Sequence, residues 1–305
     1  MTRHLLDDAD LSTADQSAIL ALAATCKSNR LGRRDLAGKS VALIFEKPST
    51  RTRMSFDVGV YELGGHPLVV DAGSTQLGRG ETLEDTAHVL SRYVHAIVFR
   101  TSGHDRITRL AAASSVPVVN ALSDLSHPCQ ALADLFTIRE HIGGPQGVTL
   151  TYLGDGNNVA HSLLVAGATA GMHVRVACPV GFEPEADVVA RANAIAAATG
   201  GSVTVTHDPR AASEGAEVLY TDVWTSMGQE IASKDRITPF LPYALDAEKV
   251  RLAAPDVLVM HCLPAHRGEE ISADAADGPR SVIFDQAENR LHAQKALLCW
   301  LAAAT

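Results

Sequence analysis

The sequence predicts an α/β protein of two domains, each with a central parallel sheet flanked by helices. Short apolar or β-branched runs alternate with longer helical patterns, which is typical of βαβ units. A turn rich in glycine and proline interrupts the middle of the chain, and 305 residues suit two domains better than one. Hydrophobic residues make up 46% of the chain and charged residues 20%, which excludes wholesale disorder.

The alternation sets the order of the predicted elements. Strands buried on both faces of a parallel sheet read as short apolar runs, and a helix follows each of them. We expect strands at residues 41–45, 68–70, 96–99, 116–119, 149–153, 174–177, 203–206, 218–220 and 257–260.

The turn at residues 143–147 follows a helical pattern and precedes a strand, so we place the domain boundary there. The first domain is expected at residues 1–142 and the second at 143–287. Residues 288–305 read as a C-terminal helix that returns to pack on the first domain. Its apolar side consists of Leu297, Leu298 and Leu301.

Charge and cysteine usage exclude several classes of protein. The net charge of −9 opposes nucleic-acid binding, because a phosphate-binding surface needs clustered Lys and Arg. No apolar run approaches the ~20 residues that a membrane span needs, so no membrane partner is expected. The cysteines are odd in number and lack CxxC spacing, which indicates neither disulfides nor zinc and favours a reducing, cytoplasmic location. They are Cys26, Cys129, Cys178, Cys262 and Cys299.

A dense polar run follows the first strand and opens a helix. Ser49 or Thr50 is expected to cap this helix. Arg51 and Arg53 in its first turn oppose the helix dipole, which favours a bound anion between them. Free N–H groups, hydroxyls and an Arg fork form a phosphate cradle. The alternative is a capped helix with solvated arginines.

A second polar segment, His127-Pro128-Cys129-Gln130, opens another helix with proline in its first turn. His127 and Gln130 lie three residues apart on one helix face, so both can reach one small group. A plain helix start with a histidine cap is the alternative.

The second domain carries polar residues just after its strands, where ligands of open α/β sheets bind. Residues 154–158 resemble the start of a dinucleotide fingerprint, but Val159 replaces its third glycine and no acid ends the next strand. NAD binding is therefore disfavoured. Asp222 follows the strand at 218–220 and can pair with an ammonium group, although an isolated Asp there is more often a loop cap.

These motifs resemble those of a known family. Residues 45–53 and 127–130 resemble the carbamoyl-phosphate signature of the aspartate and ornithine carbamoyltransferases, while 222–228 and 261–264 resemble marks of the ornithine type. The resemblance implies transfer of a carbamoyl group from carbamoyl phosphate to the δ-amine of L-ornithine, giving L-citrulline and phosphate in arginine biosynthesis. It implies no metal and no organic cofactor. It also implies a homotrimer whose active site is shared between subunits.

The resemblance assigns the site residues, and it leaves His261, His266 and His292 as structural. Arg100, His127 and Cys262 are expected to be catalytic, with the histidine polarising the carbamoyl oxygen. Carbamoyl phosphate is expected to contact Ser49, Thr50, Arg51, Thr52, Gln76, Arg100, His127, Gln130, Cys262, Leu263 and Arg290. Ornithine is expected to contact Asn158, Asp222, Ser226 and Met227.

Three other functions stay open at this point. The first is a carbamoyltransferase for another amine, such as putrescine or a modified ornithine; aspartate is disfavoured, because its second carboxylate would call for basic acceptor residues. The second is an NAD-dependent oxidoreductase. The third is a catalytically idle binding homologue, which a citrulline assay would separate from an enzyme.

Overall fold

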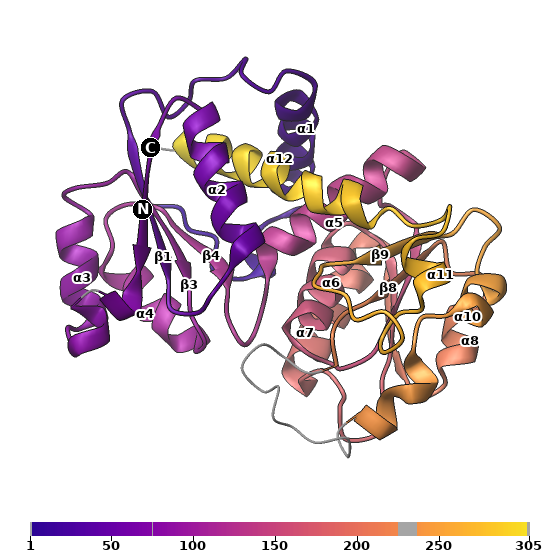
Figure 1. Ribbon diagram of the computed structural model, residues 1–305. Coiled ribbons are helices and arrows are strands. Elements are labelled where there is room, and N and C mark those ends of the chain that lie inside the picture. Colours follow the sequence, from indigo (N-terminus) through magenta and orange to yellow (C-terminus); the bar gives the residue numbers. More distant parts are fainter. Residues whose placement is uncertain (1, 75, 225–236, 304–305) are drawn as a thin grey trace. The chain divides into compact units, whose positions relative to one another are not determined.

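The computed structural model describes residues 2–74, 76–224 and 237–303, and all the strands in these residues pair in parallel. They form two sheets in two compact units, which Figure 1 shows in colours that follow the sequence. The first unit comprises Met1–Phe136 and Glu288–Thr305, and the second comprises Thr137–Ala287. The α/β fold class with parallel sheets is therefore confirmed.

The first unit contains a four-stranded sheet in the order β2-β1-β3-β4. Its strands are β1 (Ser40–Phe45), β2 (His66–Asp71), β3 (Ala96–Arg100) and β4 (Val118–Leu122). Its helices are α1 (Thr13–Ser28), α2 (Thr50–Glu62), α3 (Leu83–Leu90) and α4 (His104–Ala113). Short 3-10 turns complete it: η1 (Asp8–Asp10), η2 (Ala72–Ser74) and η3 (Leu77–Arg79).

The second unit contains a five-stranded sheet in the order β7-β6-β5-β8-β9. Its strands are β5 (Thr149–Leu153), β6 (His173–Ala177), β7 (Ser202–Thr206), β8 (Val218–Thr221) and β9 (Leu258–His261). Its helices are α6 (Asn158–Thr169), α7 (Ala186–Thr199), α8 (Pro209–Ser213), α10 (Ala247–Leu252) and α11 (Ala273–Ala276), with η4 at Thr238–Tyr243.

Two longer helices, α5 (Pro128–Ile142) and α12 (Ile283–Ala302), each begin in one unit and end in the other. The boundary between the two units, after Phe136, therefore falls inside α5. The sequence predicts the boundary later in the chain, at the glycine-rich turn. The domain limits 1–142, 143–287 and 288–305 stay our prediction.

Each of the nine apolar runs predicted as strands overlaps an observed strand. The run in β1 is continuous rather than alternating because the strand is buried on both faces; Val41, Leu43 and Phe45 are buried, as are Ala42 and Ile44 between them. Ala42 and Ile44 belong to a core cluster with residues of α3 and α4. The fourth strand starts at Val118, later than expected.

Helix α12 packs against the first unit as predicted, with Leu297, Leu298 and Leu301 buried. It comes close to α2, because a Cβ on Gly59 would lie 3.1 Å from Cγ of Lys295. A side chain larger than hydrogen at position 59 would therefore press on α12.

A buried ion pair joins the same two helices. The Lys295 ammonium, 1% exposed, donates to Oε2 of Glu62 at 2.8 Å and to the carbonyl of Arg30. Burial raises the pKa of the Glu62 carboxyl, but hydrogen bonds from Arg30 and Lys295 outweigh it and hold that pKa below its ordinary value.

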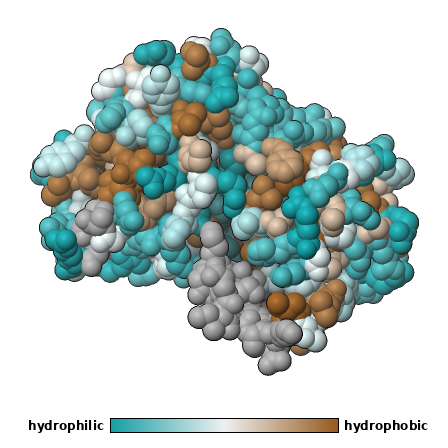
Figure 2. Space-filling model, viewed as in Figure 1, coloured by the Kyte–Doolittle hydropathy of each residue, from teal (hydrophilic) through white to brown (hydrophobic). Residues whose placement is uncertain are grey.

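Figure 2 shows a largely hydrophilic face with hydrophobic side chains scattered over it. Within the described residues, no helix has both the length and the apolarity needed to cross a membrane.

Replacing Glu62 by Met leaves the Lys295 ammonium buried without its carboxylate, so we expect a loss of about 3–5 kcal/mol in the free energy of unfolding at pH 7. Adding Lys295→Met should restore part of it. Since the folded pKa of Glu62 is lowered, its contribution is complete above the unfolded value of about 4.3 and is lost as the pH falls through the folded value. Urea unfolding at several pH values measures both effects; a Glu62→Met variant as stable as the parent contradicts them.

Candidate functional site

A cluster of hydrogen bonds in the first unit joins residues from α2, β3 and α12. The Oγ1 atom of Thr52 accepts from Nη2 of Arg290 at 3.0 Å and from Nη1 of Arg100 at 3.5 Å. Thr52, Arg100 and Arg290 are 2%, 8% and 3% exposed. Because its two lone pairs are taken, the Thr52 hydroxyl keeps its proton for a ligand oxygen. Two buried guanidinium groups beside one another favour a bound anion.

Gln130 of α5 joins this cluster with its amide in a fixed orientation. Its Oε1 accepts from Nη1 of Arg290 at 2.5 Å, and its Nε2 donates to Oδ1 of Asp134 at 2.8 Å. The carboxylate accepts only, so it fixes which end of the amide is the donor. The Gln130 oxygen has a second lone pair that can accept from an N–H group of a ligand.

His127 precedes α5 and is 5% exposed. Burial lowers the pKa of its imidazole well below the ordinary value, and the charges of Arg290 and Arg100 lower it further. A neutral imidazole can donate one hydrogen bond to a carbonyl oxygen without adding a third positive charge. This state suits the polarising role predicted for His127.

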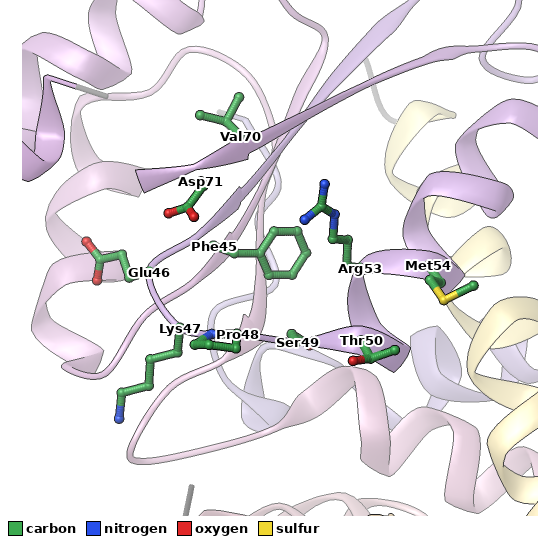
Figure 3. A pocket seen from close by; sticks show the side chains of 10 residues that line it. All are labelled: Phe45, Glu46, Lys47, Pro48, Ser49, Thr50, Arg53, Met54, Val70 and Asp71. Atoms are coloured by element: carbon green, nitrogen blue, oxygen red, sulfur yellow. The ribbon is translucent and has the colours of Figure 1, made fainter. Parts of the chain in front are cut away.

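The segment after β1 lines a pocket of about 460 Å³. In Figure 3 the guanidinium of Arg53 lies near the Phe45 ring, while the Lys47 side chain extends away from the other labelled side chains. Arg51 does not line this pocket, since side chains two residues apart on a helix do not face each other. The remaining lining residues are Glu46, Pro48, Ser49, Thr50, Met54, Val70 and Asp71.

The predicted capping hydrogen bond of α2 is not made. Ser49 occupies the cap position in an extended conformation, but its side chain makes no capping hydrogen bond. The predicted position of the cap is therefore confirmed at Ser49, but the hydrogen bond that such a residue usually makes is absent, because a sequence pattern fixes the position and not the bond. The first-turn N–H groups of α2 are not satisfied by the Ser49 side chain.

Gln76 lies at the start of η3, and its carbonyl accepts from the N–H groups of Arg79 and Glu81 at 2.9 and 3.0 Å. Its side chain is exposed. The contacts described for Gln76 thus order its turn and do not bring it to Thr52 or Arg290.

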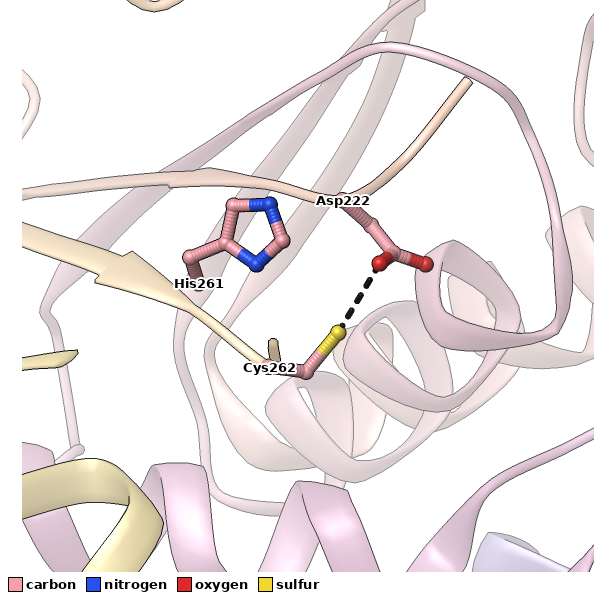
Figure 4. Close-up of side chains that lie close together, drawn as sticks. All are labelled: Asp222, His261 and Cys262. Atoms are coloured by element: carbon pink, nitrogen blue, oxygen red, sulfur yellow. Dashed lines mark hydrogen bonds between the residues drawn. The ribbon is translucent and has the colours of Figure 1, made fainter. Parts of the chain in front are cut away.

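A second cluster lies in the second unit, at the carboxyl ends of β8 and β9. Oδ1 of Asp222 accepts from the Cys262 thiol at 3.0 Å, and Oδ2 accepts from Nδ2 of Asn157 at 3.1 Å. Figure 4 shows the thiol directed at the carboxylate. Asp222 is 7% exposed. A carboxylate held in this way is oriented to receive an ammonium group.

Sequence reasoning missed Asn157. Its Oδ1 caps α6 by accepting from the N–H groups of Val159 and Ala160, and this leaves its Nδ2 to donate to Asp222. An Asn directly before a predicted helix is a recognisable cap signal. Asn158, which the sequence selected instead, is the first residue of the helix itself.

Tyr152 was also missed. Its hydroxyl lies 3.5 Å from Oδ1 of Asn157, and burial, followed by the charge of Asp222, raises its pKa well above the ordinary value. The Tyr152 hydroxyl therefore stays protonated near Asp222. Ser226 and Met227, predicted to contact ornithine, lie outside the described residues.

The chemistry of the second cluster does not favour a metal ion. Asp222, His261 and Cys262 place ligand atoms within 4.8 Å of one another. However, Nδ1 of His261 accepts from the N–H of Leu263 at 2.8 Å, and Nε2 lies 3.1 Å from Oε1 of Glu270. Since both ring nitrogens are used, the imidazole has no lone pair left for an ion.

Two domain models of one enzyme family match consecutive parts of the chain. Its carbamoyl-P binding domain model matches residues 3–140, and its Asp/Orn binding domain model matches residues 146–301. The chain belongs to the aspartate/ornithine carbamoyltransferase family.

Within that family, ornithine carbamoyltransferases are among the most similar relatives. The one from Parafrankia sp. (strain EAN1pec) is 65% identical over 303 residues, 98% of this chain and 96% of the relative. The one from Acidothermus cellulolyticus (strain ATCC 43068 / DSM 8971 / 11B) is 62% identical over 302 residues, 99% and 97% of the two chains. The solved ornithine carbamoyltransferase from Pyrococcus furiosus has a TM-score of 0.96 at 51% identity, covering 99% and 98%.

Replacing Thr52 by Val keeps its shape and removes the oxygen that Arg290 and Arg100 share. We expect the affinity for carbamoyl phosphate to fall about tenfold to a hundredfold, as hydrogen bonds to charged groups contribute about 1.5–3 kcal/mol. Thr52→Ser keeps the hydroxyl and should bind nearly as the parent does. Titration calorimetry measures both variants, and equal affinities for Val and Ser would refute the role of this oxygen.

Proposed function

We infer that this chain is an ornithine carbamoyltransferase that forms L-citrulline and phosphate from carbamoyl phosphate and L-ornithine, in arginine biosynthesis. The observation that carries this inference is the pair of opposite sites: buried guanidinium groups suited to a phosphate, and a buried carboxylate suited to an amine. Full-length similarity to ornithine carbamoyltransferases supports the same function.

We assign the phosphate end of carbamoyl phosphate to the first unit. Arg51, Arg100 and Arg290 neutralise the phosphate, which helps it to depart. Thr52 donates its hydroxyl proton, and His127 donates to the carbamoyl oxygen. Ser49, Thr50, Gln76, Gln130, Cys262 and Leu263 complete the proposed contacts.

The reaction itself needs mainly positioning. The neutral δ-amine attacks the carbamoyl carbon, the C–N bond forms, and the bond from this carbon to the phosphate oxygen breaks; the amine loses a proton, which the departing phosphate takes up. A free amine of this kind has a pKa near that of lysine, about 10.4, so the site must select its neutral form. Of the acceptor residues, Asp222 is assigned to the α-ammonium group of ornithine, and Asn158, Ser226 and Met227 to its carboxylate. Cys262 lies beside the attacking amine.

The NAD-dependent alternative is opposed by the packing of Gly156. In a dinucleotide site the second glycine lets the backbone approach a pyrophosphate. Here a Cβ on Gly156 would lie 2.2 Å from the backbone nitrogen of Pro184, and the Gly156 N–H donates to the carbonyl of Phe182. The backbone at residues 182–184 therefore occupies the space beside Gly156 that a pyrophosphate would need.

We further propose that the enzyme is a homotrimer whose active site is shared between subunits. Helix α2 exposes an apolar stripe at Met54, Val58 and Tyr61, with 61% of Met54 and 72% of Tyr61 accessible. Leu68, on the edge strand β2, is also an exposed apolar side chain. The exposed Gln76 is assigned to the neighbouring subunit's site.

We also place the enzyme in the cytoplasm. Its five cysteines are all free thiols, and four of them are buried, which suits a reducing compartment. Activity is expected in the cytoplasmic fraction of its cells, and activity confined to another fraction would refute this location.

Incubation of the purified protein with carbamoyl phosphate and L-ornithine should yield citrulline and phosphate in equal amounts. N-acetyl-L-ornithine, putrescine and aspartate should react far more slowly. N-acetyl-L-ornithine is an informative rival, because a solved N-acetyl-L-ornithine transcarbamylase resembles the chain at a TM-score of 0.88 but only 33% identity. Failure to form citrulline, or a preference for another amine, would overturn the proposal.

Asp222→Asn tests in the same assay whether this carboxylate binds ornithine. It keeps the size of the side chain and removes its charge, so kcat/KM for ornithine should fall at least about tenfold, as expected when a partly buried ion pair loses one partner. Carbamoyl phosphate binding should stay near the parent value. A loss confined to carbamoyl phosphate would reverse our assignment of the two substrates.

Tyr61→Glu should weaken the proposed trimer by placing a charge in its apolar stripe. Light scattering is expected to give three subunits for the parent and a smaller mass for this variant. Tyr93→Glu is the control, since Tyr93 is 71% exposed on a different segment. A monomeric parent, or a Tyr61→Glu variant that stays trimeric, contradicts the proposal.

A further inference from the structure

A buried imidazole–carboxylate pair lies directly beside the second cluster. The side chains of His261 and Glu270 are 0% and 1% exposed, and Nε2 of His261 lies 3.1 Å from Oε1 of Glu270. The roles assigned so far involve the next two residues of the chain, Cys262 and Leu263, and leave this pair unexplained.

The hydrogen bonds of His261 define its tautomer. Its Nδ1 accepts from the backbone N–H of Leu263 at 2.8 Å, so Nδ1 carries no proton. The proton is therefore on Nε2, which donates to Glu270. With both nitrogens used in this way, the ring is neutral and cannot take a proton from the Cys262 thiol, which is directed at Asp222 instead.

Hydrogen bonds to the surrounding fold fix both the backbone of His261 and its partner Glu270. Its backbone N–H donates to Oε1 of Gln286 at 2.9 Å, and Gln286 in turn donates to the hydroxyl of Tyr220. Glu270 is fixed as well, because its Oε1 accepts from the backbone N–H of His266 and its carbonyl accepts from Leu245.

Glu270 also keeps its charge. Burial raises the pKa of its carboxyl, but hydrogen bonds from His261 and from the His266 backbone outweigh burial and lower it. The carboxylate therefore remains an acceptor for Nε2 and maintains the tautomer that binds Leu263.

Leu263 needs such support. Its φ of 61° is the sole positive value at a non-glycine position in the described part of the chain. This left-handed conformation costs roughly 1–3 kcal/mol for a side chain such as leucine, so surrounding contacts must maintain it. The bond from its N–H to His261 is a contact of this kind.

We propose that His261, oriented by Glu270, is a positioning residue that holds the Cys262–Leu263 turn in its left-handed conformation. It thereby directs the thiol at Asp222 and sets the Leu263 backbone for the substrates. This inference rests on the proposed function, since that function gives Cys262 and Leu263 their ligands. His261 itself does not touch a reacting atom.

Two substitutions separate the two hydrogen bonds of the imidazole. His261→Asn places an amide near the position of Nδ1, where its oxygen can still accept from Leu263, but it cannot reach Glu270. His261→Gln places its amide near the position of Nε2, where it can donate to Glu270, but it leaves the Leu263 N–H without an acceptor. The two variants therefore test which bond matters for the reaction.

We expect kcat to fall between about tenfold and a hundredfold in His261→Gln, because misplacement by about 1 Å has an effect of that order. In His261→Asn both kcat and the KM for carbamoyl phosphate should stay within about threefold of the parent, whereas His261→Gln should also raise this KM, because Leu263 is a proposed contact of carbamoyl phosphate. A purely structural role would lower the melting temperature of both variants without separating their kcat values. Equal kcat values in the two folded variants would overturn the proposal.

Glu270 provides a second pair of variants if those at His261 do not fold. Glu270→Gln keeps an oxygen that accepts from His261 and His266, and it should retain most of the parent kcat. Glu270→Met lacks that oxygen and should lose kcat as His261→Gln does. Equal kcat values for Gln and Met would again count against the proposal.

The alkylation rate of Cys262 by iodoacetamide gives a readout that does not need activity. His261→Gln should raise this rate several-fold by releasing the turn, and His261→Asn should not. The other four cysteines are buried and should react slowly. Mass spectrometry can confirm that the label is on Cys262. If the parent forms no citrulline but the two variants still differ in alkylation, the proposed function fails and the positioning role stands. If citrulline forms and the alkylation rates are the same, the positioning role fails alone.

Discussion

The hydrogen bonds from Arg290 are the constraint on which the first site depends. One guanidinium reaches Thr52 on α2 and Gln130 on α5, so three elements far apart in the sequence share a single charged group. Arg100 lies against the same threonine. Burying two positive charges side by side is unfavourable unless an anion lies between them. The site is therefore locally positive, although the net charge of the whole chain is −9. Burial lowers the pKa of His127, and the charges of Arg290 and Arg100 lower it further. The two guanidinium groups thus favour a bound anion and also help to keep the neighbouring imidazole neutral.

The second site contains a buried negative charge, that of Asp222, at the carboxyl ends of the strands of its own sheet. Asp222 follows β8 and Cys262 follows β9, and because these parallel strands are neighbours, their carboxyl ends bring the two side chains within hydrogen-bond distance. Sheet topology thereby does most of the positioning. The remaining precision comes from groups behind the site, Asn157 on one side and the His261–Glu270 pair on the other.

Much of the fold could be predicted because its signals are local. Apolar runs marked every strand, and the leucines of α12 marked its buried face. The resemblance selected Thr52, Gln130 and Arg290, which the structure brings together. Asp134 and Glu270 could not be predicted, because a lone acid in the sequence does not reveal which partner the fold brings to it. Ser49 shows the same limit, since a serine at the cap position does not guarantee the capping hydrogen bond. Asn157 was recoverable from its cap position.

The first unit is built from both ends of the sequence, with residues 288–305 completing what residues 1–136 begin. During synthesis the ribosome releases the whole second unit before the segment that carries Arg290 and Lys295. Until then Glu62 lacks its ammonium partner and Thr52 lacks one of its two guanidinium donors. The second unit can therefore fold while the chain is still growing, whereas the anion site of the first unit cannot form until the segment that carries Arg290 has been synthesised.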